Sequence, residues 1–226
     1  MHIVFFVIEA ALLTTYRIVT AYNLETMSIF FKYLCSLAFF FYGAYCFYKN
    51  KNRNEEDKTI SVKIMLTLFL AFLADIVIQV KFRTGFIVFI LVQLSLFITY
   101  LELGKFNWRI FTVSVPVSVV LMLIDIFTPA IQLGSLAVPV FIYMLLVCTT
   151  STTALFGLRG HTTGRTILAV AAVLFAISTY LLHFSVKGIG TLTGSAAFVV
   201  TTFNNIFYYL SQMLMAYSLT KDIVKE

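Results

Sequence analysis

The stretch ISVKIMLTLFLAFLADIVIQV, residues 60–80, decides the class of fold. It is about 20 residues long and almost entirely apolar, which is what a helix needs to cross a lipid bilayer. Its second half carries one carboxylate, Asp75. A charge in lipid costs roughly 2.5–3.5 kcal/mol at a helix centre unless it is neutralised, paired or turned toward a wet cavity. The stretch therefore predicts a membrane-spanning helix in which Asp75 has a specific purpose.

The composition of the whole chain supports a membrane protein. Of 226 residues, 61% are hydrophobic and 12% are charged, whereas a soluble domain is about half apolar and a quarter charged. Cys35, Cys46 and Cys148 all lie in apolar runs. We therefore expect neither a disulfide framework nor a structural zinc site.

The apolar segments predict one all-α domain over residues 1–226, a polytopic membrane helix bundle of about eight transmembrane helices. The first segment contains Glu9 and Arg17, so we expect a spanning helix there and not a cleaved signal peptide. The predicted spans are roughly 3–22, 27–48, 60–80, 85–103, 109–128, 133–153, 166–184 and 196–219.

The basic residues predict the orientation of the bundle. The segments 49–63, 105–109 and 159–165 and the C-terminal tail hold eleven Lys and Arg, while the opposite connections hold Lys81, Arg83 and Lys187. Because cytoplasmic loops are enriched in basic residues, we expect both termini in the cytoplasm and the chain in the plasma (inner) membrane. The net charge of +6 is thus accounted for by topology, and no nucleic-acid partner is expected.

Four spans carry polar side chains at helical spacing. Residues four or seven apart share one face of a helix, and intramembrane polar groups usually face the interior of a bundle. We therefore expect a common internal pocket, although interhelical hydrogen bonds that only hold helices together are the alternative for single Ser, Thr or Asn residues. The stripes are Asp75 and Gln79; Gln93 and Tyr100; Thr179 and His183; and Asn205, Tyr209 and Gln212.

The order of these residues resembles the YhhN-like membrane proteins, a family that includes the lysoplasmalogenases. The resemblance extends over about residues 28–219, and a repeated "LF....D..L" element in the family suggests two related four-helix halves. The matching segments are FFKYL with Lys32, LFLAFLADIVI with Asp75, FRTGFIVFILVQLSLFITY with Gly85, Phe89 and Tyr100, VLFAISTYLL with Phe175 and Ser178, and FYYLSQMLMAYS with Tyr208, Tyr209 and Gln212.

The resemblance implies hydrolysis of the vinyl ether bond of lysoplasmalogen to an aldehyde and a glycerophospho-alcohol, with no metal or organic cofactor. Asp75 would be the principal acid and base. The second acid of the family is replaced by Thr179, and His183, one turn further along, is the candidate to take over proton transfer. The expected partner is a membrane lysolipid. The expected substrate-binding residues are Lys32, Gln79, Gln93, Tyr143, Ser178, Tyr208, Tyr209 and Gln212.

Three further departures from the family pattern are Tyr33, Ala74 and Gln93. Two other functions stay open. One, favoured by Thr179, is a lysolipid-binding protein that does not cleave its ligand. The other is a small transporter that uses Asp75 and Lys32 as a proton or substrate site.

Overall fold

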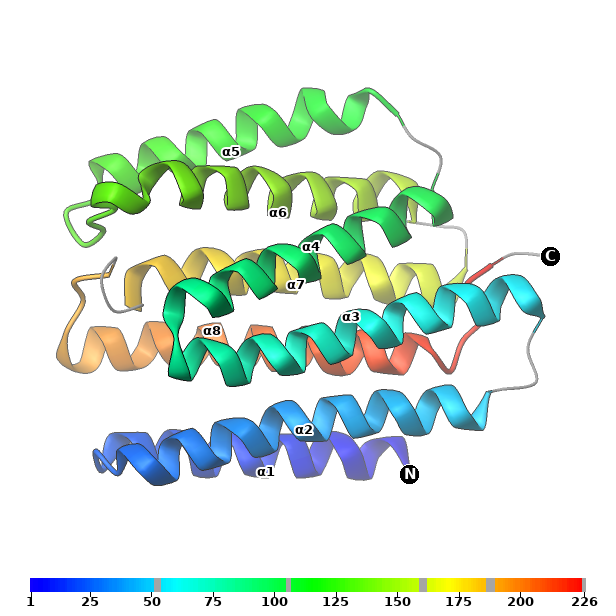
Figure 1. Ribbon diagram of the computed structural model, residues 1–226, viewed down its shortest axis with the longest axis horizontal. Coiled ribbons are helices and arrows are strands. Elements are labelled where there is room, and N and C mark those ends of the chain that lie inside the picture. Colours follow the sequence, from blue (N-terminus) through cyan, green and yellow to red (C-terminus); the bar gives the residue numbers. More distant parts are fainter. Residues whose placement is uncertain (51–53, 105–106, 159–161, 186–189, 225–226) are drawn as a thin grey trace.

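The chain forms an all-α bundle in a computed structural model that describes residues 1–50, 54–104, 107–158, 162–185 and 190–224. Within these ranges, eight long helices run roughly along one axis (Figure 1). Their bounds are α1 His2–Ala21, α2 Glu25–Lys49, α3 Glu55–Val80, α4 Phe82–Leu103, α5 Arg109–Phe127, α6 Ala137–Gly157, α7 Thr163–Ser185 and α8 Gly194–Ser218, with a short 3₁₀ helix at Gly134–Leu136.

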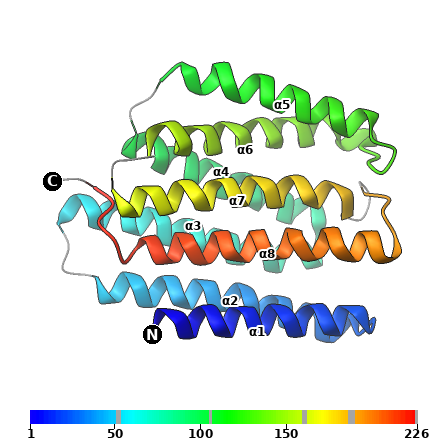
Figure 2. The same cartoon turned by 180° about the vertical axis from the view of Figure 1, so that it is seen from behind.

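Seven of these helices, α1 to α7, are long and apolar enough to cross a bilayer. Helix α8 is equally long, but its middle carries polar residues such as Asn204, Asn205 and Gln212. It packs against α7 (Figure 2) and also contacts α1, α2 and α3. These polar groups are therefore buried among other helices. The all-α polytopic bundle predicted from the sequence is thus confirmed, and the relation between its two halves stays a prediction.

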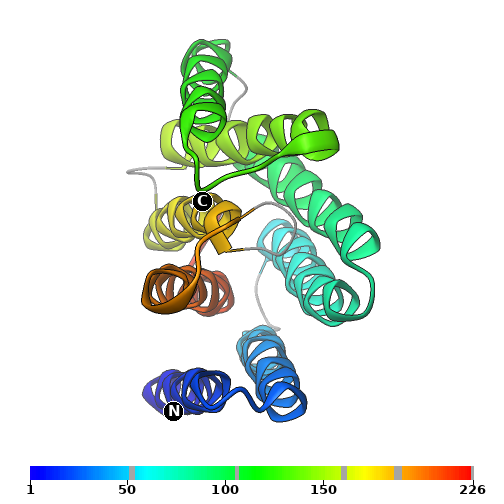
Figure 3. The same ribbon diagram turned by 90° about the vertical axis from the view of Figure 1, so that its left-hand side faces the viewer.

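Successive helices alternate in direction, so both termini lie at one end of the bundle (Figure 1). Seen along the bundle, α1 and α2 form one side, α5 and α6 the other, and α3, α4, α7 and α8 lie between them (Figure 3). The most extensive pairings are α7 with α8 and α3 with α4. This connectivity brings the ends of α1, α3, α5 and α7 together with the starts of α2, α4, α6 and α8, at the end opposite the termini.

Several predicted boundaries differ from the structure by one to five residues, and two of the differences have a clear local cause. Helix α3 begins at Glu55, where the side chain of Asn54 accepts a hydrogen bond from the Asp57 amide at 2.8 Å. This cap and an acidic first turn extend the helix well beyond its apolar part. Helix α6 begins at Ala137 and not at residue 133, because Gly134 has a φ of +49° and belongs to the 3₁₀ turn.

Helices α3 and α4 are joined at Lys81 alone. The connection is this short because Gly85 in the first turn of α4 lies directly against α3. A Cβ on Gly85 would come within 2.4 Å of the Ile78 Cα. The tight hairpin fixes the position of Asp75, which lies a turn and a half before the end of α3.

Candidate functional site

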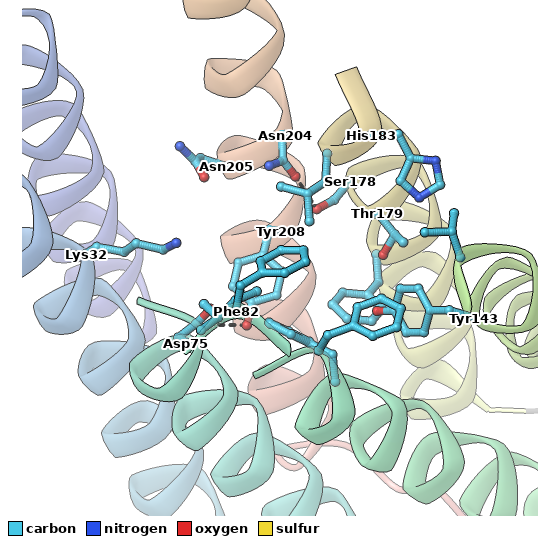
Figure 4. A pocket seen from close by; sticks show the side chains of 16 residues that line it. Lys32, Asp75, Phe82, Tyr143, Ser178, Thr179, His183, Asn204, Asn205 and Tyr208 are labelled. Carbon is cyan, nitrogen blue, oxygen red and sulfur yellow. Dashed lines mark hydrogen bonds between the residues drawn. The ribbon is translucent and has the colours of Figure 1, made fainter. Parts of the chain in front are cut away.

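A cavity of about 90 Å³ lies inside the bundle, in the half opposite the termini. Six helices line it, because the end of α3 and the end of α7 meet the starts of α2, α4, α6 and α8 there. Figure 4 shows its side chains. The lining residues are Lys32, Asp75, Ile78, Phe82, Phe86, Phe89, Val140, Tyr143, Phe175, Ser178, Thr179, Leu182, His183, Asn204, Asn205 and Tyr208.

The wall of the cavity is mainly aromatic. Phe82, Phe86 and Phe89 follow one face of α4 at helical spacing, and Phe175 faces them from α7. The ring of Phe86 meets that of Tyr143 edge-on at 5.1 Å, and the ring of Phe175 lies 5.7 Å from that of Tyr208. Such a lining suits an apolar or cationic group.

On one side of the cavity, Asp75 is only 3% exposed and is held by hydroxyl groups. Its Oδ2 atom accepts hydrogen bonds from the Ser36 hydroxyl at 2.7 Å and from the Tyr208 hydroxyl at 2.9 Å. These donors come from α2 and α8, which both contact α3. The two hydroxyl groups replace the water that a carboxyl group loses on burial.

Lys32 approaches the same cavity from α2 and points into it (Figure 4). It is close enough to Asp75 for an electrostatic interaction, but the two make no ion pair among those found in the described ranges. The Tyr209 hydroxyl donates to the Lys32 backbone oxygen at 3.4 Å. The amine of Lys32 is therefore available to an anionic group of a ligand.

On the opposite side, His183 lines the cavity and is 4% exposed (Figure 4). Its Nδ1 atom lies 2.9 Å from Oδ2 of Asp125, a residue of α5 that is 0% exposed. An ionised carboxylate can only accept a hydrogen bond, so Nδ1 carries the shared proton in the state in which Asp125 is ionised. Tyr180 lies beside the pair, with its ring 5.9 Å from that of His183.

Asp125 is the residue that sequence reasoning missed. It lies in the apolar run LMLIDIF, near the end of α5. The signal that singled out Asp75, a carboxylate within a predicted span, applied to Asp125 as well. The spacing of residues along α5 does not indicate that Asp125 contacts α7. The backbone of α5 packs on α6, and only the Asp125 side chain extends to His183.

The structure brings seven of the predicted site residues to this one cavity. Ser178 donates from its hydroxyl to Oδ1 of Asn204 at 2.8 Å, and the Tyr143 hydroxyl interacts with the side chains of Thr179 and Gln93. These residues connect the two sides of the cavity. The seven are Lys32, Asp75, Tyr143, Ser178, Thr179, His183 and Tyr208.

Four predicted site residues lie outside the cavity lining, and so does Tyr100 of the predicted Gln93 stripe, whose hydroxyl donates to the Leu168 backbone oxygen at 3.5 Å. Gln93, Tyr209 and Gln212 are buried outside the lining, and the side-chain amide of Gln212 has no hydrogen-bond partner in the described part of the chain. Gln79 is exposed. The expectation that Gln79 faces the same pocket as Asp75 is wrong, because Gln79 lies one turn further on, at the last turn of α3.

Two other buried ionisable groups lie on α1. Glu9 is 5% exposed, and neither of its carboxyl oxygens has a hydrogen-bond partner among the described residues. Arg17 donates from Nη2 to the Phe198 backbone oxygen at 2.9 Å and stacks on the Phe198 ring at 4.3 Å. Neither residue lines the cavity. Glu102, at the other end of the bundle, pairs with Lys63.

No group of three or more His, Cys, Asp or Glu side chains that could hold a metal ion occurs within the ranges that the structure describes. The cavity itself offers one carboxylate, one imidazole and one amine, together with hydroxyl and amide groups. This set suits proton transfer and the binding of an anionic amphiphile.

Comparison with known proteins identifies the family. No curated protein and no solved structure matches the chain. The model of the YhhN family matches residues 27–219, from the start of α2 to the end of α8, and includes every residue that lines the cavity. The chain therefore belongs to the YhhN family.

Proposed function

We propose that this YhhN-family membrane protein hydrolyses the vinyl ether bond of a lysoplasmalogen within the cavity. The observation that carries the proposal is the placement of two proton-transfer groups, Asp75 and His183, on opposite walls of one aromatic pocket (Figure 4). Vinyl ether hydrolysis needs an acid that protonates carbon and a base that activates water. The two side chains supply these roles.

In the first step, Asp75 in its carboxylic acid form donates its proton to the carbon of the double bond that does not carry oxygen. The carbon attached to oxygen becomes an oxocarbenium ion. The Asp75 carboxylate and the ring faces of Phe82, Phe86 and Phe89 stabilise this cation. The Ser36 and Tyr208 hydroxyls hold Asp75 in place during the transfer.

In the second step, His183 takes a proton from water as the water oxygen bonds to the cationic carbon, which gives a hemiacetal. The hemiacetal then collapses. The imidazolium of His183 returns a proton to the departing glycerol oxygen, and the Asp75 carboxylate takes the hydroxyl proton. One water is consumed, an aldehyde and a glycerophospho-alcohol are released, and both residues regain their starting protonation states.

The size of the cavity limits how the lipid binds. Pockets for drug-sized ligands measure about 300–1,000 Å³, so about 90 Å³ holds the reacting bond and adjoining atoms only. The alkyl chain and the head group extend beyond it. Lys32 is the basic group placed to meet the phosphate.

We also propose that both termini face the cytoplasm. The excess of basic residues on the terminal side supports this orientation. The cavity then lies in the outer half of the membrane, and the lysolipid enters from that leaflet. Reporter enzymes fused to the C-terminus test the orientation: a cytoplasmic reporter should be active and a periplasmic one silent, and the reverse pattern would contradict it.

The test of the function is aldehyde release by the purified protein in detergent. The expected result is turnover of a lysoplasmalogen and none of the matched alkyl ether lysolipid, which has no double bond to protonate. A native protein that binds the lysoplasmalogen but releases no aldehyde would contradict the proposal.

That outcome would favour the second candidate, a lysolipid-binding protein without hydrolysis. The observation in its favour is Thr179, which lines the cavity where the family resemblance predicts an acid. The variant Thr179→Asp separates the two functions. A binding protein that lost its second acid should gain hydrolysis from this variant, whereas a hydrolase that relies on His183 should not need it.

A further inference from the structure

The side chains of His183 and Asp125 form a hydrogen bond between two helices, α7 and α5, at the wall of the cavity. Nδ1 of His183 and Oδ2 of Asp125 are 2.9 Å apart, and the two residues belong to helices whose backbones are not in direct contact. Asp125 therefore reaches from α5 to the wall of the cavity that α7 forms. Its other oxygen, Oδ1, makes no well-aligned hydrogen bond in the described ranges, and the Tyr180 hydroxyl is the nearby group that interacts with this carboxyl.

Asp125 does not itself line the cavity. It meets a ligand only through His183, whose ring lies between the carboxylate and the cavity. With Nδ1 engaged by Asp125, the second ring nitrogen, Nε2, is directed away from the carboxylate. Among the described residues no hydrogen-bond partner of Nε2 is found.

We propose that Asp125 is a positioning residue for His183. Its carboxylate accepts the Nδ1 proton, which fixes the ring and the tautomer so that the Nε2 lone pair faces the cavity. When His183 takes a proton from water, Asp125 stabilises the resulting imidazolium. Helix α5 thus contributes a carboxyl group to the same wall that carries Thr179. The catalytic part of this inference rests on the proposed hydrolysis.

The first test is independent of activity and uses ¹⁵N-histidine NMR of the full-length protein in detergent. The chain has three histidines, and the His183 signals are assigned by their loss in His183→Gln. We expect native His183 to be protonated at Nδ1, and Asp125→Asn to shift it toward the Nε2 tautomer. Asp125→Glu should restore the native form.

His2 is the internal control. It contacts the Tyr42 hydroxyl at 3.0 Å in another part of the bundle, so its signals should not change. A His183 tautomer that is the same in the native protein and in Asp125→Asn would overturn the inference. This result stands whether or not the protein hydrolyses a vinyl ether.

The second test uses turnover. Asp125→Asn should lower kcat by about 10²-fold and leave KM unchanged, as expected for loss of an aligned general base. Asp125→Asn placed in a His183→Gln background should cost nothing further, since Asp125 acts only through His183. A further loss in the double variant would contradict the positioning role. If the native protein is inactive, the proposed hydrolysis fails while the NMR test still decides the role of Asp125.

Discussion

The two sides of the cavity hold a carboxyl group in different ways. Asp75 lines the cavity directly and is held by the Ser36 and Tyr208 hydroxyls of α2 and α8. Asp125 lies one side chain further out and reaches the cavity through His183. The first arrangement suits a group that gives its proton to substrate. The second suits His183 as a base, because the Asp125 carboxylate stabilises the positive charge that the imidazole gains when it takes up a proton.

The largest effect should follow from changing the acid on the Asp75 side. Asp75→Asn keeps the shape of the side chain but removes the transferable proton, so kcat for aldehyde release should fall by about 10³–10⁴-fold. Glu102→Gln is the matched control, because Glu102 pairs with Lys63 away from the cavity. Equal turnover by Asp75→Asn and the native protein would remove Asp75 from the mechanism.

A smaller loss is expected from the base on the other side. His183→Gln retains hydrogen bonding to Asp125 but cannot take up a proton, and kcat should fall by about 10²–10³-fold. His2→Gln is the matched control, since His2 lies outside the cavity lining. If His183→Gln turns over as fast as the native protein, only the Asp75 side of the cavity takes part in catalysis.

The hydroxyl groups around Asp75 should contribute mainly to stability. Tyr208→Phe and Ser36→Ala each remove one hydrogen bond to the buried, neutral carboxyl group of Asp75, which corresponds to about 0.5–1.5 kcal/mol in the free energy of unfolding. Unfolding titrations in mixed micelles measure the change. Thr99→Val, which removes a hydroxyl that donates only to its own helix at Ser95, should cost less. An equal cost for Thr99→Val would mean that the hydroxyls do not hold Asp75.

The smallest effect is expected at Gln79. Because this side chain is exposed and outside the cavity, Gln79→Ala should change the free energy of unfolding by less than about 0.5 kcal/mol and leave kcat unchanged. The same turnover and unfolding measurements apply. A large loss of turnover would mean that the bound lipid contacts Gln79 at the last turn of α3.

Much of the helix bundle could be predicted from the sequence, because a helix in lipid needs about 20 apolar residues and turns its polar side chains toward the bundle interior. Span length predicted the helices, and the polar stripes predicted a common pocket for Asp75, Thr179 and His183. Lys32 and Tyr208 were expected there only from the family resemblance. Helical spacing does not indicate where a helix end leaves the bundle interior, so the orientation of Gln79 was predicted wrongly.

The hydrogen-bond partner of His183, Asp125, could not be predicted from the sequence for a different reason. Spacing along α7 relates His183 to its neighbours on the same helix, but the residue opposite it is set by how α5 packs on α6 beside α7. Asp125 is more than fifty residues away in the chain and contacts His183 only through side chains. Only the three-dimensional arrangement shows the pair.

The most direct test of the two-sided mechanism is hydrolysis of a lysoplasmalogen by the native protein in D₂O, with the aldehyde trapped at once by reduction. Proton transfer from Asp75 to carbon predicts one deuterium on the carbon next to the former aldehyde carbon. Asp75→Asn should give almost no labelled product. Aldehyde that forms without deuterium at this carbon would contradict protonation of the double bond, and with it the role of Asp75 as the acid.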